Sequence, residues 1–252
     1  CYQDARFMVV ATPSGITLAP EGGAHQSINS PLIGLSQPGL TSFEPAYADE
    51  LAHIMQWGFG HMQADDGGSV YLRLSTRVID QPVRDFTPIA DDLLAGAYWL
   101  REPAPGAELA VAYTGVIAPE AITAHDALLE DIPGAGLLAV TSADQLYTDW
   151  QATTRAHANG PDVAPSHIEN LLGRLAPGAG LVTVLDGHPA TLAWLGGVAN
   201  HDVAALGVES FGQSGNLQDL YRTHGIDADA ILDGAAAVIT KRMRKRIRAT
   251  AA

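Results

Sequence analysis

ELAVAYTGVIAPEAITAHDALLEDIPGAGLLAVT, residues 108–141, predicts a strand, a helix and a second strand in succession. The apolar runs 108–114 and 136–141 have the length and composition of buried strands, and the segment 118–131 between them suits a helix. Two strands joined by a helix in this way form a parallel pair, because a parallel connection needs a long crossover. The stretch therefore predicts an α/β fold.

The same alternation continues on both sides of this stretch. We expect further downstream strands at 180–186 and 203–208, and helices at 143–156, 166–175, 188–195, 217–223 and from Asp227 or Asp229 to about Arg248. We expect upstream strands at 7–11, 41–44 and 69–75, a helix from Pro45 to about Gln63, and a long loop over 15–38. This order predicts a mostly parallel sheet with helices on both faces. The proline- and aspartate-rich segment 78–92 predicts a domain boundary, with domains at 1–88 and 89–252.

Composition and charge exclude several classes of protein. The chain has 252 residues, 47% of them hydrophobic, so it can bury a core, and no apolar run has the roughly 18 residues of a membrane span. The net charge is −14, and residues 241–248 hold six of the 14 basic side chains. The remainder therefore carries eight basic against 28 acidic residues, a balance of −20. Such a body repels nucleic acid, and we interpret the basic run as the solvated end of a helix.

Cysteine content and the first residues bear on compartment and completeness. A single cysteine excludes an internal disulfide framework and is compatible with a reducing compartment. The first residues lack the pattern of a signal peptide. The chain begins at Cys1, without Met, and enters an apolar strand almost at once. We therefore expect a piece cut from a larger protein.

The segment LAPEGGAHQS, residues 18–27, is the main candidate for chemistry. Two adjacent glycines allow tight turns between Glu21 and His25, and the turn could bring the carboxylate and the imidazole together. Histidine in such a loop can act as an acid, a base or a hydrogen-bond donor near neutral pH. The alternative is a surface turn with an incidental histidine.

Other site motifs are absent from the sequence. It contains no G-x-S-x-G elbow, no G-x-x-x-x-G-K-[ST] loop and no G-x-G-x-x-G fingerprint. His53 and His61 lie eight residues apart on one predicted helix, and no pair of histidines has metal-ligand spacing, so we expect no metal site in this chain. The glycine-bounded segment 211–215, FGQSG, could present backbone amides to an anion or be a plain connection.

Several segments, in order, resemble the thiamine-diphosphate-dependent transketolase superfamily, and in particular the homodimeric E1 component of bacterial pyruvate dehydrogenase. They are Leu18–Ser27 with its Glu-Gly-x-x-His pattern, Pro31–Gly34, Phe43–Tyr47, Glu50–Ala52, Val140–Ser142, 207–215 and Leu220–Ile226. Transketolases carry Asp-Gly-x-x-His, so Glu21 favours the E1 side. The resemblance implies the C-terminal half of a pyrimidine-binding domain at 1–88 and a transketolase C-terminal-like domain at 89–252.

The resemblance also implies an activity. Thiamine diphosphate would supply the carbanion chemistry for decarboxylation of a 2-oxo acid of the pyruvate type, and the acyl group would pass to a lipoyl carrier. His25 would face the reactive carbon of the cofactor, and Glu21 would orient His25 or contact the substrate. Gln26 and Ser27 would line the same pocket.

By the same resemblance, the cofactor site is shared and incomplete in this chain. The magnesium ligands, the diphosphate site and the activating glutamate would lie in N-terminal domains outside the chain, so we expect the fragment alone to be inactive. The expected partners are those missing domains or a subunit carrying them, a second copy in a homodimer, and a lipoyl-carrying acyltransferase, with neither nucleic acid nor membrane, in the cytoplasm. Two alternatives remain open: ketol transfer as in transketolase, and a non-catalytic subunit for dimerisation or docking.

Overall fold

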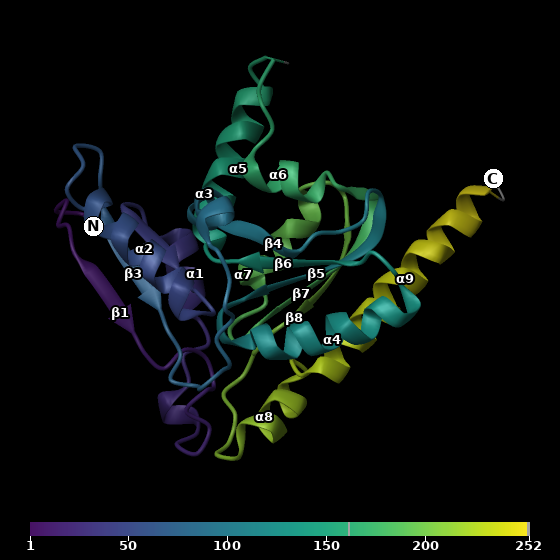
Figure 1. Cartoon of the computed structure of the whole chain (residues 1–252), viewed down its shortest axis with the longest axis horizontal. Helices are drawn as coiled ribbons and strands as arrows, with labels where there is room; N and C mark the ends of the chain where they lie inside the picture. The colour runs from purple at the N-terminus through teal and green to yellow at the C-terminus, as the bar shows by residue number, and fades with distance from the viewer. Residues whose placement is uncertain (161, 251–252) are drawn as a thin grey trace.

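A computed structural model describes residues 1–160 and 162–250. Its strands form a small and a large sheet (Figure 1). The small sheet is parallel, in the order β1–β3–β2: β1 Met8–Ala11, β2 Leu40–Phe43 and β3 Ser69–Arg73. The large sheet has the order β4–β6–β5–β7–β8: β4 Ala97–Arg101, β5 Ala107–Thr114, β6 Gly136–Val140, β7 Leu175–Leu185 and β8 Asp202–Leu206. The predicted α/β fold with a mostly parallel sheet is confirmed, since only β4 runs antiparallel to its neighbour.

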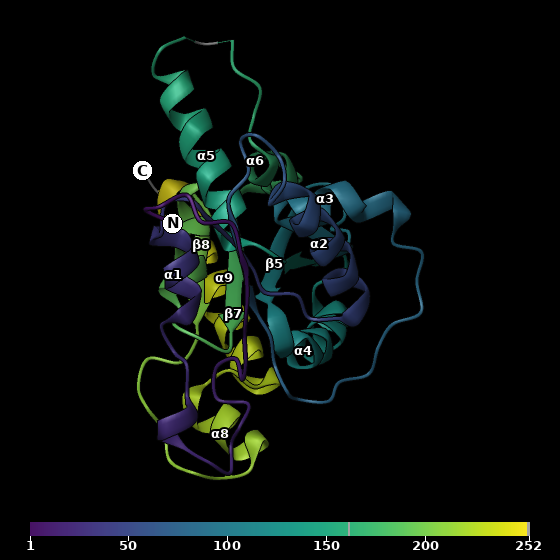
Figure 2. The ribbon, with the colours of Figure 1, turned by 90° about the vertical axis from the view of Figure 1, so that its left-hand side faces the viewer.

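Helices cover both faces of the large sheet. The α-helices are α1 Ser30–Ser36, α2 Ala48–His61, α3 Ala90–Ala95, α4 Ala118–Asp131, α5 Ala143–His157, α6 His167–Leu172, α7 Ala190–Ala193, α8 Leu217–His224 and α9 Ala228–Thr250. Short 3-10 turns are η1 Gly23–His25, η2 Thr87–Ile89, η3 Gly115–Ile117 and η4 Trp194–Gly197. Helices α4 and α9 pack on one face, while α5, α6 and α7 lie on the other (Figures 1 and 2). No helix within the described residues is long and apolar enough to cross a membrane.

The two sheets share one hydrophobic core. Side chains of the small sheet, such as Phe43 and Leu72, belong to the same buried cluster as Tyr113 and Val182 of the large sheet. The opposite face of the large sheet buries a second cluster that contains Trp99 and Leu146. The first cluster therefore crosses the predicted domain boundary at residue 88, and this boundary stays a prediction.

The structure corrects the expected local structure at three places. The segment 15–38, expected to be a loop, contains η1 and also α1, whose first turn carries Pro31. Helix α2 begins at Ala48 and not at Pro45, because the Glu50 carboxylate accepts the amides of Ala46 (2.7 Å) and Tyr47 (3.1 Å) and caps the helix there. Strand β4 was not expected.

Candidate functional site

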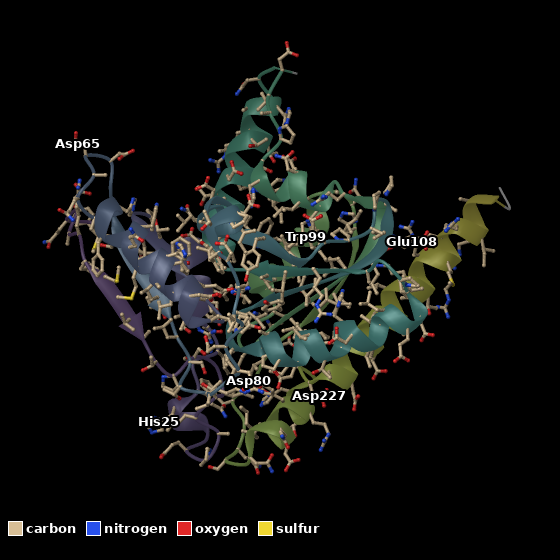
Figure 3. All side chains as sticks on the ribbon, in the orientation of Figure 1. His25, Asp65, Asp80, Trp99, Glu108 and Asp227 are labelled. Carbon is tan, nitrogen blue, oxygen red and sulfur yellow. The ribbon has the colours of Figure 1, made fainter. Side chains whose placement is uncertain are left out.

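Glu21 and His25 lie close together near the tip of a loop over residues 15–28, which we call the 15–28 loop. The 3-10 turn η1 carries His25, whose Nε2 lies 3.9 Å from the Glu21 carboxylate. The Glu21 side chain is 58% exposed, and the His25 side chain is 51% exposed. Figure 3 shows His25 at the outer edge of the molecule, away from the large sheet. The pair is thus open to a ligand or to another protein surface.

A second loop, residues 211–215, packs against this pair's loop. The Gly212 amide donates to Gln26 Oε1 at 2.7 Å, and the Gly215 amide donates to the Ala19 carbonyl at 3.1 Å. Because the 211–215 loop leads into α8, a segment near the C-terminal end of the chain supports the loop that carries His25 (Figure 1). Segments far apart in the sequence therefore form one surface.

Two buried nitrogen atoms next to this contact lack hydrogen bonds. Gln26 Nε2 and His224 Nε2 have no partner among the described residues, and both face Gly212. A β-carbon at Gly212 would lie 2.7 Å from His224 Nε2 and 3.4 Å from Gln26 Nε2. Burial lowers the pKa of His224, so its imidazole is neutral at neutral pH.

Hydrogen bonds of Ser27 hold the two ends of the 15–28 loop together. Its hydroxyl donates to the Pro13 carbonyl (3.1 Å) and accepts from the Gly15 amide (3.0 Å), and its own amide donates to the Gly15 carbonyl (3.0 Å). Gln26 Oε1 and the Ser27 hydroxyl are thus engaged within the protein framework. Their expected place in a ligand pocket stays a prediction, as do the roles of Glu21 and His25.

Sequence reasoning missed a buried ionic cluster of Glu44, Arg73 and Asp186. Arg73 is 2% exposed and forms an ion pair with Glu44, which follows β2. Asp186, which follows β7, is 0% exposed, and its carbonyl accepts from Arg73 Nη2 at 2.7 Å. All three residues lie at the carboxyl ends of parallel strands, the edge where α/β sheets place functional groups. Their position at the ends of strands was the signal from which these residues could have been predicted.

The cluster holds two carboxylates for one guanidinium. Burial raises the pKa of Glu44, and it raises the pKa of Asp186 to about 6, while the nearby Arg73 opposes both shifts. Each carboxylate has a hydrogen-bond partner. Arg73 pairs with Glu44, and Tyr221 donates its hydroxyl to Asp186 Oδ2 at 3.0 Å. Burial in this cluster therefore favours the protonated form of both carboxyl groups, against the attraction of Arg73.

The residues present fit only part of a thiamine diphosphate site. A carboxylate and an imidazole side by side at an open edge suit the reacting end of such a cofactor. Within residues 1–160 and 162–250, no group of three His, Cys, Asp or Glu side chains could hold a metal ion. The expectation that the magnesium and diphosphate ligands lie outside this chain stays a prediction.

Comparisons with known proteins agree with the fold and with the resemblance. Residues 2–80 match the family model for the pyruvate dehydrogenase E1 component middle domain. The pyruvate dehydrogenase E1 component of Mycolicibacterium smegmatis is 29% identical over 233 residues, which cover 90% of this chain and 25% of that protein. The 6-deoxy-6-sulfo-D-fructose transketolase subunit SqwH of Clostridium sp. is 29% identical over 181 residues, 71% of this chain and 51% of that subunit.

The solved transketolase from Leishmania mexicana has the same fold, with a TM-score of 0.69 at 17% identity, over 92% of this chain and 30% of that one. The chain thus spans about a quarter of the length of the E1 relative described above. The resemblance predicted from the sequence is confirmed.

Proposed function

We propose that this pyruvate dehydrogenase E1-like chain of the transketolase superfamily is the C-terminal part of a thiamine-diphosphate-dependent 2-oxo acid dehydrogenase E1. The completed enzyme would decarboxylate a 2-oxo acid of the pyruvate type and pass the acyl group to a lipoyl carrier. The observation that carries the proposal is the Glu21–His25 pair, held at an open edge 3.9 Å apart. The E1 family match over residues 2–80 includes this pair.

The chain's own residues have defined tasks in this proposal. Bound thiamine diphosphate supplies the carbanion chemistry. His25 Nε2 holds a proton for the substrate oxygen on which negative charge develops. The Glu21 carboxylate, 3.9 Å from His25 Nε2, orients the imidazole. The 211–215 loop keeps the pair in place through Gln26.

The open edge of the small sheet supports completion by missing domains. Phe7 and the edge-strand residues Val9 and Val10 are 40%, 39% and 52% exposed. Adjacent strand residues point to opposite faces, so both faces of the sheet are uncovered at β1. Proteins rarely leave an apolar edge strand open, because it pairs with other chains. We propose that the missing N-terminal domains, or a subunit carrying them, cover this edge, and that the completed enzyme is a cytoplasmic homodimer that docks a lipoyl-carrying acyltransferase.

Ketol transfer is the second candidate, because the transketolase subunit SqwH is as similar in identity as the E1 relative. A non-catalytic docking subunit is the third. The three candidates differ in products. An E1 releases carbon dioxide from a 2-oxo acid, a transketolase transfers a ketol group without decarboxylation, and a docking subunit does not depend on His25.

The test uses the chain completed by its cognate diphosphate-binding domains, with thiamine diphosphate and Mg²⁺. We expect carbon dioxide release from pyruvate, and we expect His25→Ala to lower turnover by about 10²–10⁴ without changing the melting temperature. His157→Ala, at an exposed histidine on α5, is the matched control and should retain activity. Ketol transfer without decarboxylation would favour the second candidate, and unchanged turnover in the His25 variant would favour the third.

A further inference from the structure

The buried ionic cluster contacts both ends of the loop that carries Glu21 and His25. We propose that Arg73 and Asp186 are positioning residues that fix this loop in the completed enzyme. The part of the inference that concerns catalysis rests on the proposed function. The part that concerns the loop rests on the contacts alone.

Arg73 anchors the C-terminal end of the loop. Its Nη2 donates to the Ser27 carbonyl at 3.0 Å, and its Nε donates to the Ser30 hydroxyl at 2.7 Å. The remaining Nη1 pairs with Glu44. The guanidinium thus uses its fixed fork of donors on three separate segments, which a lysine ammonium cannot reproduce.

Asp186 anchors the N-terminal end of the loop. Its Oδ1 accepts from the Ile16 amide at 2.9 Å. Gly15 has a φ of +54°, and a β-carbon there would lie 2.0 Å from the same carboxylate oxygen. The backbone therefore approaches Asp186 as closely as only glycine permits.

The two anchors are joined to each other. Arg73 Nη2 donates to the Asp186 carbonyl at 2.7 Å, and Gly15 pairs with Ser27 across the base of the loop. A loop of this length, closed at its base by buried charge-assisted hydrogen bonds, keeps its ends fixed while its tip stays exposed. Movement of either anchor displaces the loop that holds Glu21 and His25 without requiring the sheets to unfold.

Arg73→Lys tests the anchor while it keeps the buried positive charge beside Glu44. The matched control is Arg84→Lys, because Arg84 also pairs with a carboxylate, that of Asp49 (2.7 and 3.1 Å), and its hydrogen-bond partners Asp49, Glu50 and Tyr98 lie outside both the loop and the ionic cluster. Amide hydrogen exchange of the chain itself is measured by NMR. In Arg73→Lys we expect the Ile16 and Ser27 amides to exchange at least about tenfold faster, with β5–β7 amides and the melting temperature little changed. The control should leave the exchange of both loop amides unchanged.

Three outcomes decide the proposal. Unchanged exchange at Ile16 and Ser27 in a folded Arg73→Lys protein would overturn it. Equal acceleration in the loop and in β5–β7 would also overturn it, because the cluster would then act on global stability only. If Arg73→Lys does not fold, Ser30→Ala removes one acceptor without touching a buried charge, and it must accelerate exchange at Ser27 for the proposal to stand.

The completed enzyme separates this inference from the proposed function. We expect Arg73→Lys to lower kcat about tenfold or more with KM changed less, since the anchor orients the pair and does not touch the substrate. If the wild-type completed enzyme has no activity, the proposed function fails while the exchange result still decides the anchoring. If the wild-type enzyme is active and Arg73→Lys loses the loop order but no turnover, the catalytic part of the inference fails.

Discussion

Replacing Asp186 by Asn should remove an unusual dependence of stability on pH. Burial raises the pKa of the Asp186 carboxyl from its ordinary value of 3.8 to about 6 in the folded protein. The folded state therefore binds a proton that the unfolded chain, with the ordinary value, does not bind between pH 6 and pH 4. The contribution of this group to the free energy of unfolding consequently rises as the pH falls through 6.

The magnitude follows from the two pKa values. The full difference corresponds to about 3 kcal/mol, of which about 1 kcal/mol is gained between pH 7.5 and pH 5. The Asn side chain does not titrate, and it keeps an oxygen for the Ile16 amide. The free energy of unfolding of Asp186→Asn, measured relative to wild type, should thus be about 1 kcal/mol higher at pH 7.5 than at pH 5.

Urea unfolding followed by tryptophan fluorescence between pH 5 and pH 7.5 measures this difference, with m-values checked for equality. Asp66→Asn removes a negative charge at an exposed position and controls for net charge. The difference between variant and wild type also cancels the titration of distant groups common to both, whereas the pKa of Glu44, which Asp186 raises, changes with the substitution. Parallel stability profiles for wild type and Asp186→Asn would refute the reasoning.

Three further substitutions test other parts of the structure. Gly212→Ala places a β-carbon 2.7 Å from His224 Nε2, so the imidazole or the 211–215 loop must shift. We expect a loss of about 1–3 kcal/mol in urea unfolding, and an unchanged midpoint would contradict the close packing. Tyr98→Phe removes the hydroxyl that bonds to the buried Glu50 carboxylate, and calorimetry should show a loss of about 1–3 kcal/mol in the free energy of unfolding. Unchanged stability would mean that the carboxylate finds another partner. Val10→Lys lies at the open edge of the small sheet and should change the stability of the chain by less than about 0.5 kcal/mol. It should weaken binding of the missing domains tenfold or more in calorimetric titration. Equal binding would mean that these domains bind elsewhere.

Helices and strands with an unbroken pattern of apolar residues could be predicted from the sequence. The helix expected at 118–131 matches α4, and the strand expected at 108–114 differs from β5 by one residue, because each has an apolar pattern that only one structure satisfies. Helix α1 was missed because its glycine, proline and serine content resembles that of a loop. Strand β4 was missed because antiparallel pairing at the edge of the large sheet depends on β6, which lies far along the chain.

The candidate site divides in the same way. A local spacing with two glycines predicts that Glu21 and His25 can meet, and they lie 3.9 Å apart. The ionic cluster could not be derived from spacing, because Arg73 is 113 residues from Asp186 and their contact depends on how the two sheets pack. Local pattern identifies the exposed pair, whereas the order of strands and the packing of the sheets determine the groups that support it.

The ionic cluster has a consequence for any attempt to separate the chain at residue 88. Such a cut would leave Arg73 with Glu44 on one product and Asp186, without the guanidinium, on the other, each next to apolar surface that the intact chain buries. Each half would therefore lack the charged groups and the apolar surface that the other half supplies. Heating the intact polypeptide should therefore produce one cooperative calorimetric peak in place of two, even though its strands belong to separate sheets.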